Sequence, residues 1–189
     1  MDETCVNHHD RKSKQEAKEW FAPGSSAPKQ KLFKLSSITC LSLDESFIIF
    51  ETCRLKAVKR DTAELSIYAK LFQLPITNVK LGVTLRKRNA YVNSPLYEYQ
   101  IDGCAFFRNK RRNPLAELFY NFLGLKTHSN VNHSCPYDHD IILDRFVLNQ
   151  NFASVVPLPV GSYLISTNWQ IDAVVRANVS LGLEALDKN

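Results

Sequence analysis

The densest group of side chains that could do chemistry lies between residues 128 and 140. It contains three histidines, one cysteine and two aspartates, and these side chains include the usual zinc ligands. Pro136 fixes a turn inside the group, however, and the chain offers no second pair of ligands at a matching spacing. We therefore interpret the segment as a loop anchored by a disulfide, and we expect no metal and no cofactor.

The sequence lacks the motifs of the common enzyme classes. It has no Gly-x-Ser-x-Gly nucleophile elbow, no His-Glu-x-x-His zinc helix, no Gly-Lys-Ser/Thr phosphate loop and no Gly-x-Gly-x-x-Gly dinucleotide loop. We therefore expect no catalytic residues and a chain that is not an enzyme.

Two basic runs, at residues 86–88 and 108–112, raise the question of nucleic-acid binding. A nucleic-acid surface would also place aromatic rings between the charges. Phe106 and Phe107 precede the second run, but their pattern equally fits the end of a buried strand. We interpret both runs as solvated loops and expect no nucleic-acid partner.

Five cysteines bear on the redox environment of the protein. Cys5 lies in a polar segment, and the body of the chain contains Cys40, Cys53, Cys104 and Cys135. No two form a Cys-x-x-Cys pair, which argues against a zinc ribbon or a thioredoxin-like site. The four body cysteines suit either a disulfide framework, with three connectivities, or four buried thiols. Taken alone, they leave both interpretations open.

Two acceptor sites for N-linked glycans favour export. Asn132 and Asn178 each begin an Asn-x-Ser sequence. In contrast, the chain has no apolar stretch before residue 32 of the kind that a conventional signal peptide needs. The sequons and the N-terminal residues therefore point in opposite directions.

The composition fits one globular domain with a polar tail. The 189 residues are 44% hydrophobic and 23% charged, with a formal net charge of +5, and no apolar run approaches the ~18 residues of a membrane span. Residues 1–31 are polar and would bury too little surface to offset the entropy of ordering them, so we expect a disordered tail. Residues 32–186 then form a single domain.

Hydrophobic periodicity predicts the elements of that domain. Apolar and polar residues alternate, as in antiparallel strands with one buried face. The alternating segments are residues 63–71, 79–85, 97–101, 163–171 and 173–183, and less regular apolar runs lie at 33–41, 47–58 and 140–148. About eight strands predict an all-β antiparallel sandwich.

One segment has the helical period instead. Asn113 and Pro114 predict an N-cap and a first helical residue, and Gly124 predicts the stop. We expect one amphipathic helix over residues 113–124, whose apolar stripe covers an open end or edge of the sandwich. The stripe consists of Leu115, Leu118, Phe119, Phe122 and Leu123.

Several motifs together resemble a known family. They are residues 40–53 (Cys-x-Ser-x-Asp-x-Ser-Phe-x-x-Phe-Glu-x-Cys), 132–142 (Asn-His-Ser-Cys-Pro-Tyr-Asp-His-Asp-Ile-Ile), 158–163 (Leu-Pro-Val-Gly-Ser-Tyr), Ile-Asp-Gly-Cys at 101–104 and the helix. In order and spacing, residues 32–183 are similar to a large insect family of small secreted proteins. That family is mostly described as a domain of unknown function, includes the CheB chemosensory proteins and is related to the ML lipid-recognition group.

The resemblance implies an extracellular, immunoglobulin-like or ML-like β-sandwich that takes lipids between its sheets. The expected function is non-enzymatic binding of a small hydrophobic ligand, a lipid or a cuticular hydrocarbon, in a chemosensory role. The expected protein is a monomer, with a membrane receptor as a further partner. The candidate ligand contacts are Tyr99, Ile101, Leu115, Leu118, Phe119, Phe122, Tyr163 and Trp169.

A second class of function stays open beside the first. It is an extracellular module that binds protein or glycan through its loops and has a solid core. A cavity of several hundred Å³ between the sheets would favour the ligand carrier, whereas a filled core with an exposed aromatic patch would favour the module.

The predicted elements also suggest a specific disulfide pairing. Cys40 and Cys53 flank the turn around Asp44 on consecutive strands, and Cys104 and Cys135 bracket the helix. We predict the bonds Cys40–Cys53 and Cys104–Cys135, with Cys5 unpaired.

Deletion of residues 1–31 tests the assignment of the tail. A polar tail contributes little buried area, so the melting temperature of the truncated protein should match that of the full chain. A thermal melt that shows a drop of more than a few degrees would mean that the tail packs on the sandwich.

Overall fold

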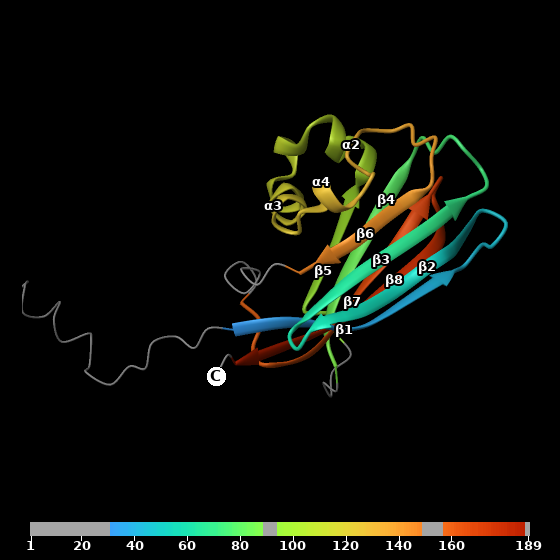
Figure 1. Cartoon of the computed structure of the whole chain (residues 1–189). Helices are drawn as coiled ribbons and strands as arrows, with labels where there is room; N and C mark the ends of the chain where they lie inside the picture. The colour runs from blue at the N-terminus through green and yellow to red at the C-terminus, as the bar shows by residue number, and fades with distance from the viewer. Residues whose placement is uncertain (1–30, 89–93, 149–156, 188–189) are drawn as a thin grey trace, which may run out of the picture.

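The computed structural model describes residues 31–88, 94–148 and 157–187. Within them, eight strands confirm the predicted antiparallel β-sandwich (Figure 1). The strands are β1 Lys31–Ser42, β2 Ile48–Lys59, β3 Thr62–Leu71, β4 Val79–Lys87, β5 Tyr97–Asp102, β6 Ile141–Val147, β7 Gly161–Ile171 and β8 Val174–Asp187. Residues 1–30, with Cys5 and nearly all of the predicted tail, lie outside the described residues.

The strands form two sheets of unequal width. The larger has the order β1-β8-β7-β4-β5 and the smaller the order β2-β3-β6. A disulfide between Cys40 on β1 and Cys53 on β2 links the two sheets, with a Cα–Cα distance of 6.1 Å. This bond joins consecutive strands, as the sequence predicted.

Alternating apolar side chains of both sheets fill the space between them. On β3, Leu65, Ile67, Ala69 and Leu71 are buried and the residues between them are not, because successive side chains of a strand point to opposite faces. The larger core cluster combines β1, β3, β4, β6, β7 and β8; its buried members include Phe33, Leu65, Leu85, Phe146, Tyr163 and Leu183.

The helical part of the chain is larger than the single predicted helix. Four short elements follow β5: α2 Gly103–Arg108, η1 Lys110–Arg112, α3 Pro114–Phe122 and α4 Leu125–His128. They connect β5, an edge of the larger sheet, with β6, an edge of the smaller one (Figure 1). No helix in the described part of the chain is long and apolar enough to span a membrane.

Helix α2, like η1 and α4, was not predicted from the sequence. Phe106 and Phe107 looked like the end of a strand, but the Asp102 carboxylate accepts a hydrogen bond from the backbone N–H of Ala105 at 2.8 Å. This contact caps a helix at the point where β5 ends. The aspartate three residues before Ala105 was the available signal.

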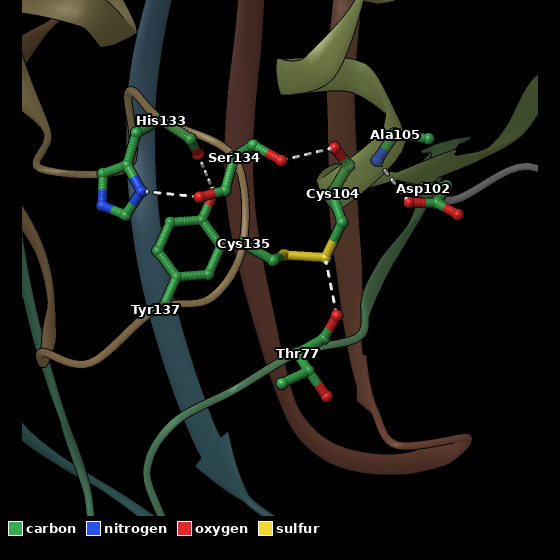
Figure 2. Close-up of a disulfide and its surroundings, with 8 residues drawn as sticks. All are labelled: Thr77, Asp102, Cys104, Ala105, His133, Ser134, Cys135 and Tyr137. Atoms are coloured by element: carbon green, nitrogen blue, oxygen red, sulfur yellow. Dashed lines mark hydrogen bonds between the residues drawn. A yellow bond between two sulfur atoms is a disulfide. The ribbon is translucent and has the colours of Figure 1, made fainter.

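A second disulfide fixes both ends of the helical segment (Figure 2). It joins Cys104, at the start of α2, to Cys135, in the loop before β6, with a Cα–Cα distance of 5.1 Å. The Ser134 hydroxyl also donates to the carbonyl oxygen of Cys104 at 3.1 Å. The bond therefore ties the departure of the chain from β5 to its return toward β6.

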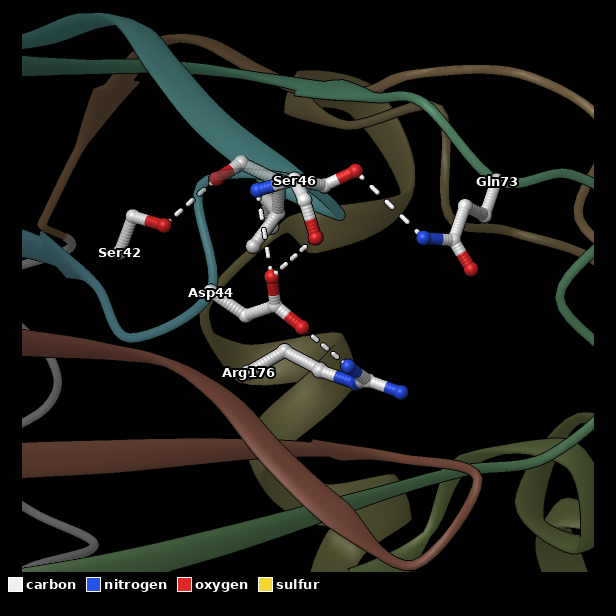
Figure 3. A network of polar contacts seen from close by, with 6 residues as sticks. Ser42, Asp44, Ser46, Gln73 and Arg176 are labelled. Carbon is white, nitrogen blue, oxygen red and sulfur yellow. Dashed lines mark hydrogen bonds and ion pairs between the residues drawn. The ribbon is translucent and has the colours of Figure 1, made fainter.

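A polar cluster holds the corner between β1 and β2 against β8 (Figure 3). The Asp44 carboxylate accepts hydrogen bonds from the backbone and the hydroxyl of Ser46 and pairs with the Arg176 guanidinium. That guanidinium also lies 4.6 Å from the centroid of the Phe47 ring. The hydrogen bond from Ser46 is the main cause that lowers the pKa of Asp44 below 3.8; Arg176 adds to it, and burial opposes both.

Replacing Arg176 with methionine tests this corner. Because the folded-state pKa of Asp44 is lowered, the ionised carboxylate stabilises the fold above the unfolded-state pKa, and this contribution disappears as pH falls through the folded-state value. Arg176→Met should therefore lower the melting temperature by a few degrees at neutral pH and by less near pH 3. Melts across this pH range, with Lys80→Met on the exposed face of β4 as control, would contradict the account if the deficit did not shrink in acid.

Candidate ligand-binding site

Helix α3 is fixed at both ends as its sequence predicts. The Asn113 side chain accepts a hydrogen bond from the backbone N–H of Ala116 at 3.1 Å, and Pro114 is the first helical residue. Gly124, just beyond the helix, has a φ of 61°, the left-handed conformation that glycine adopts without strain. The Tyr99 hydroxyl donates to the same Asn113 oxygen at 2.7 Å, so β5 contacts the N-cap of α3.

The buried face of α3 differs from the predicted stripe. Ala116 and Tyr120 are buried, and the Tyr120 ring packs edge-on against Phe106 and Phe107 of α2 at centroid distances of 5.7 and 5.4 Å. Phe119 and Leu123 pack against the larger core cluster, as predicted.

The predicted burial of Leu115 and Leu118 is wrong. Their side chains are 45% and 46% exposed. Phe106 and Phe107 of α2 pack on Tyr120. The buried face of α3 is therefore the one that contains Ala116 and Tyr120, and Leu115 and Leu118 lie on the more exposed side. The side chain of Phe122 lies outside the described part of the structure.

The candidate strand residues divide into core and edge. Tyr163 is fully buried, and its hydroxyl donates to the carbonyl oxygen of Pro159 at 2.7 Å. Trp169 packs edge-on against Phe50, with ring centroids 5.8 Å apart, and Ile101 packs against the α2–α3 contact. Tyr163 therefore lies in the packed interior, and Trp169 and Ile101 are partly buried against it.

Four apolar side chains of β5 and α3 remain exposed, and the Tyr99–Asn113 hydrogen bond links the two elements. They are Tyr97 (58% exposed), Tyr99 (38%), Leu115 (45%) and Leu118 (46%). We call this set the β5–α3 edge. The strand pairing places Tyr97 and Tyr99 opposite Leu85 and Val83, on the face of the larger sheet that turns toward the smaller one. Tyr97 was missed as a candidate, although it belongs to the same alternating segment as Tyr99.

The histidine-rich loop has a structural role in the arrangement seen here. Tyr137 is buried beside it, and its hydroxyl donates to the carbonyl oxygen of His133 at 2.8 Å (Figure 2). Burial raises the pKa of Tyr137 to about 12. The His133 and His139 Nε2 atoms lie 2.9 Å apart. Among the described residues, no three His, Cys, Asp or Glu side chains are grouped to hold a metal ion.

Asp140 fastens the end of this loop to β3. Its carboxylate accepts hydrogen bonds from the backbone N–H of Leu71 at 2.8 Å and from the Tyr68 hydroxyl at 2.7 Å. These contacts, the backbone one first, lower the pKa of Asp140, and burial opposes them. The aspartate therefore stays ionised at neutral pH and serves as a tether for the loop.

Two pockets show how space is distributed around the sandwich. One, of about 470 Å³, lies on the outer face of the larger sheet; residues that line it include Gly82, Thr84, Gln100, Asn168 and Gln170. The other, beside Phe33 and Leu148 at one end of the sandwich, measures about 10 Å³, which is about the space of a single water probe. The larger space has both polar and apolar lining residues, the latter being Val83, Tyr99 and Val175.

Comparison with known proteins gives one family match. Residues 79–165, which run from β4 through the helical segment into β7, match the family model described as "Protein of unknown function (DUF1091)". A Niemann-Pick type C2 protein from the Japanese carpenter ant is similar in structure, with 14% identity and a TM-score of 0.30 over 82% of this chain and 93% of that one. No curated protein sequence matches the chain.

Removal of the Cys104–Cys135 bond tests what positions the β5–α3 edge. The bond closes a loop of 31 residues, for which chain entropy gives about 4 kcal/mol of stability. Cys104→Ala with Cys135→Ala should lower the free energy of unfolding by that order. It should also raise amide hydrogen exchange in α2, α3 and α4 above that of β7 and β8.

The matched control is the Cys40→Ala, Cys53→Ala variant, which lacks the other disulfide. It should lose a similar amount of stability without a selective rise of exchange in the helices. Equal exchange of the helices in the two variants would contradict the assigned role of Cys104–Cys135.

Proposed function

We propose that this chain is an extracellular, non-enzymatic binding domain for a small hydrophobic ligand, and that the ligand contacts the β5–α3 edge. The observation that carries the proposal is the exposure of Tyr97, Tyr99, Leu115 and Leu118, between 38% and 58%. Two of these residues come from the inner face of a sheet and two from an amphipathic helix, positions where apolar side chains are normally covered.

The edge has the chemistry and the rigidity that such a ligand needs. Its leucines offer aliphatic surface, its tyrosines offer rings, and each Å² of apolar area covered by a ligand contributes about 25 cal/mol. Tyr99 is held by its hydrogen bond to the Asn113 cap. The residues on both sides of the edge are thereby preorganised, which lowers the entropic cost of binding.

The packed interior determines how a ligand would sit. Phe119 and Leu123 of α3 already contact the larger core cluster, so a ligand enclosed between the sheets would have to displace them. The proposal therefore places the ligand along the β5–α3 edge, in contact with the exposed side of α3. A lipid tail or a cuticular hydrocarbon, the ligands implied by the family resemblance, has a suitable narrow apolar shape.

Two features support an extracellular location. Cys40–Cys53 and Cys104–Cys135 are both disulfide-bonded, and such bonds persist in oxidising compartments. Asn132 lies exposed in the loop before β6, accessible to a glycan. A chemosensory role and a membrane receptor as partner extend the proposal on the family resemblance alone.

A second candidate function rests on the same packed core. An extracellular module that binds a protein or a glycan would also have a filled interior and an exposed aromatic surface, here Tyr97 and Tyr99. Such surfaces often mark interaction sites. The two functions differ in the size of the partner, and one titration separates them.

The test is binding of a fluorescent fatty acid to wild-type protein and to a Leu118→Lys variant. Leu118 is 46% exposed, so the substitution should leave the fold intact while placing a charge in the proposed contact. Loss of about 1.5 kcal/mol of apolar contact weakens binding by about tenfold. Val58→Lys on β2, where an apolar side chain is 48% exposed away from the edge, should bind like wild type.

Three outcomes would contradict the proposal in different ways. Equal weakening by both lysine variants would show that the edge is not the site. Binding that is unchanged in both would place the ligand elsewhere. Wild-type protein that takes up neither the fatty acid nor any component of a lipid extract in native mass spectrometry would favour the interaction module instead.

A further inference from the structure

The outer face of the larger sheet carries an unusual run of uncharged polar residues around Asn178. Strand pairing sets one row across four strands and a second row across three of them. The first row is Asn178, Asn168, Gly82 and Gln100, and the second is Ser180, Ser166 and Thr84. Amide and hydroxyl groups, which can both donate and accept hydrogen bonds, therefore cover the middle of this face.

The pocket of about 470 Å³ lies over these rows. It is lined by Gly82 and Gln100 of the first row, by Thr84 of the second, by Glu98 and by the apolar residues Val83 and Tyr99. Asn168 also lines it, and Asn178 is the next residue along that row. Neighbouring strands are about 4.8 Å apart, so Asn178 stands one strand away from the pocket.

The Asn178 amide is aimed toward the pocket. Its Nδ2 donates to the Asn168 Oδ1 at 2.7 Å, and the Ser180 hydroxyl donates to the Asn178 Oδ1 at 3.0 Å. Nδ2 is the atom that would carry a glycan at this sequon. A sugar that replaces the other Nδ2 hydrogen would begin beside Asn168, the residue that separates Asn178 from Gly82 in the first row.

Gly82 leaves open space on this face, although the backbone at this position does not require a glycine. A Cβ atom at this position would lie 3.7 Å from the Asn168 Cβ, an ordinary contact. Gly182 on the same face is different, because a Cβ there would come within 2.5 Å of the hydroxyls of Ser36 and Ser37. Glycine inside a strand often marks the close approach of another group. At Gly182 that group is β1, whereas at Gly82 the space is open.

We propose that an N-linked glycan on Asn178 lies in this pocket, with its first sugars over Asn168 and Gly82. The inference rests on the extracellular location proposed above. Sugar hydroxyls and acetamido groups both donate and accept hydrogen bonds, as do Thr84, Gln100 and Gln170 around the pocket. Val175, which is 41% exposed and also lines the pocket, offers an apolar contact for a sugar ring.

The attachment itself is an ordinary group transfer. A lipid-linked oligosaccharide pyrophosphate is the donor; the Asn178 Nδ2 forms a bond to C1 of the first sugar, and the bond between C1 and the pyrophosphate oxygen breaks. One proton leaves Nδ2, and the lipid pyrophosphate is released. The amide keeps one N–H, so a hydrogen bond to Asn168 remains available to hold the linkage in place.

The arrangement would separate the two faces of the molecule. The glycan would cover the outer face of the larger sheet, whereas Tyr97 and Leu118 lie at the edge where the inner face opens. Tyr99 belongs to the β5–α3 edge and also lines the pocket, so the two surfaces meet at that residue.

The test compares the release of two glycans from the same molecule. The full chain is secreted from eukaryotic cells behind an added leader, and site occupancy is followed by peptide mass spectrometry during digestion of the native protein with an N-glycosidase. Asn132 lies in an exposed loop and serves as an internal reference. We expect glycan release at Asn178 to be several-fold slower than at Asn132 in the folded protein, and equal after denaturation.

A larger side chain at position 82 should fill the pocket and abolish the protection of the Asn178 glycan from the N-glycosidase. Gly82→Leu, or Gly82→Thr if the first variant is not secreted, should raise the release rate at Asn178 to that at Asn132. Thr39→Trp adds large bulk on β1, opposite Ser180 and on the side of β8 away from the pocket, and should leave the protection unchanged. Ser180→Ala removes the sequon and should remove the glycan, whereas Ser180→Thr should keep it.

An empty Asn178 in the secreted protein, equal release at the two sites, or protection that survives filling of Gly82 would each overturn the inference. These outcomes are independent of fatty-acid binding. A protected glycan on a protein that binds no hydrophobic ligand would contradict only the proposed function, and the reverse result would contradict only the glycan site.

Discussion

The Cys104–Cys135 disulfide is the constraint on which the exposed edge of this sandwich depends. The chain leaves one sheet at β5, forms three short helical turns and α3, and enters the other sheet at β6. Each of these helices is too short to be stable alone in water, so their positions depend on packing and on the fixed ends of the segment. The covalent bond supplies those ends, and the Asn113 cap shared with Tyr99 sets the place of α3 between them.

Much of the fold was predictable because its signals are local. Alternation with period two identified the strands, and Asn113, Pro114 and Gly124 bounded α3 through capping chemistry. The orientation of α3 was not predictable in the same way. A wide apolar stripe fits several rotations of a helix, and the choice among them was made by Phe106 and Phe107 of α2, whose own periodicity resembles a strand.

The candidate site shows the same division between local and tertiary information. Tyr163 and Trp169 were correctly placed on an inward face. The alternating pattern of a strand does not reveal, however, whether that strand lies in the middle or at the edge of its sheet. Tyr163 is fully buried on an inner strand of its sheet, whereas Tyr99 has the same pattern and is 38% exposed on an edge strand. Depth depends on the strand order β1-β8-β7-β4-β5, which makes β7 central and β5 an edge. Sequence periodicity contains no information on that order.

The central claim is that a hydrophobic ligand contacts the β5–α3 edge while the inter-sheet core stays closed. Side-chain NMR of the protein titrated with a saturated fatty acid tests it most directly. The account predicts intermolecular nuclear Overhauser effects from the acyl chain to Leu115, Leu118 and the ring of Tyr97, with the core signals of Leu65 and Leu183 unchanged. Contacts of the acyl chain with Leu65 and Leu183, with none at the edge, would contradict it.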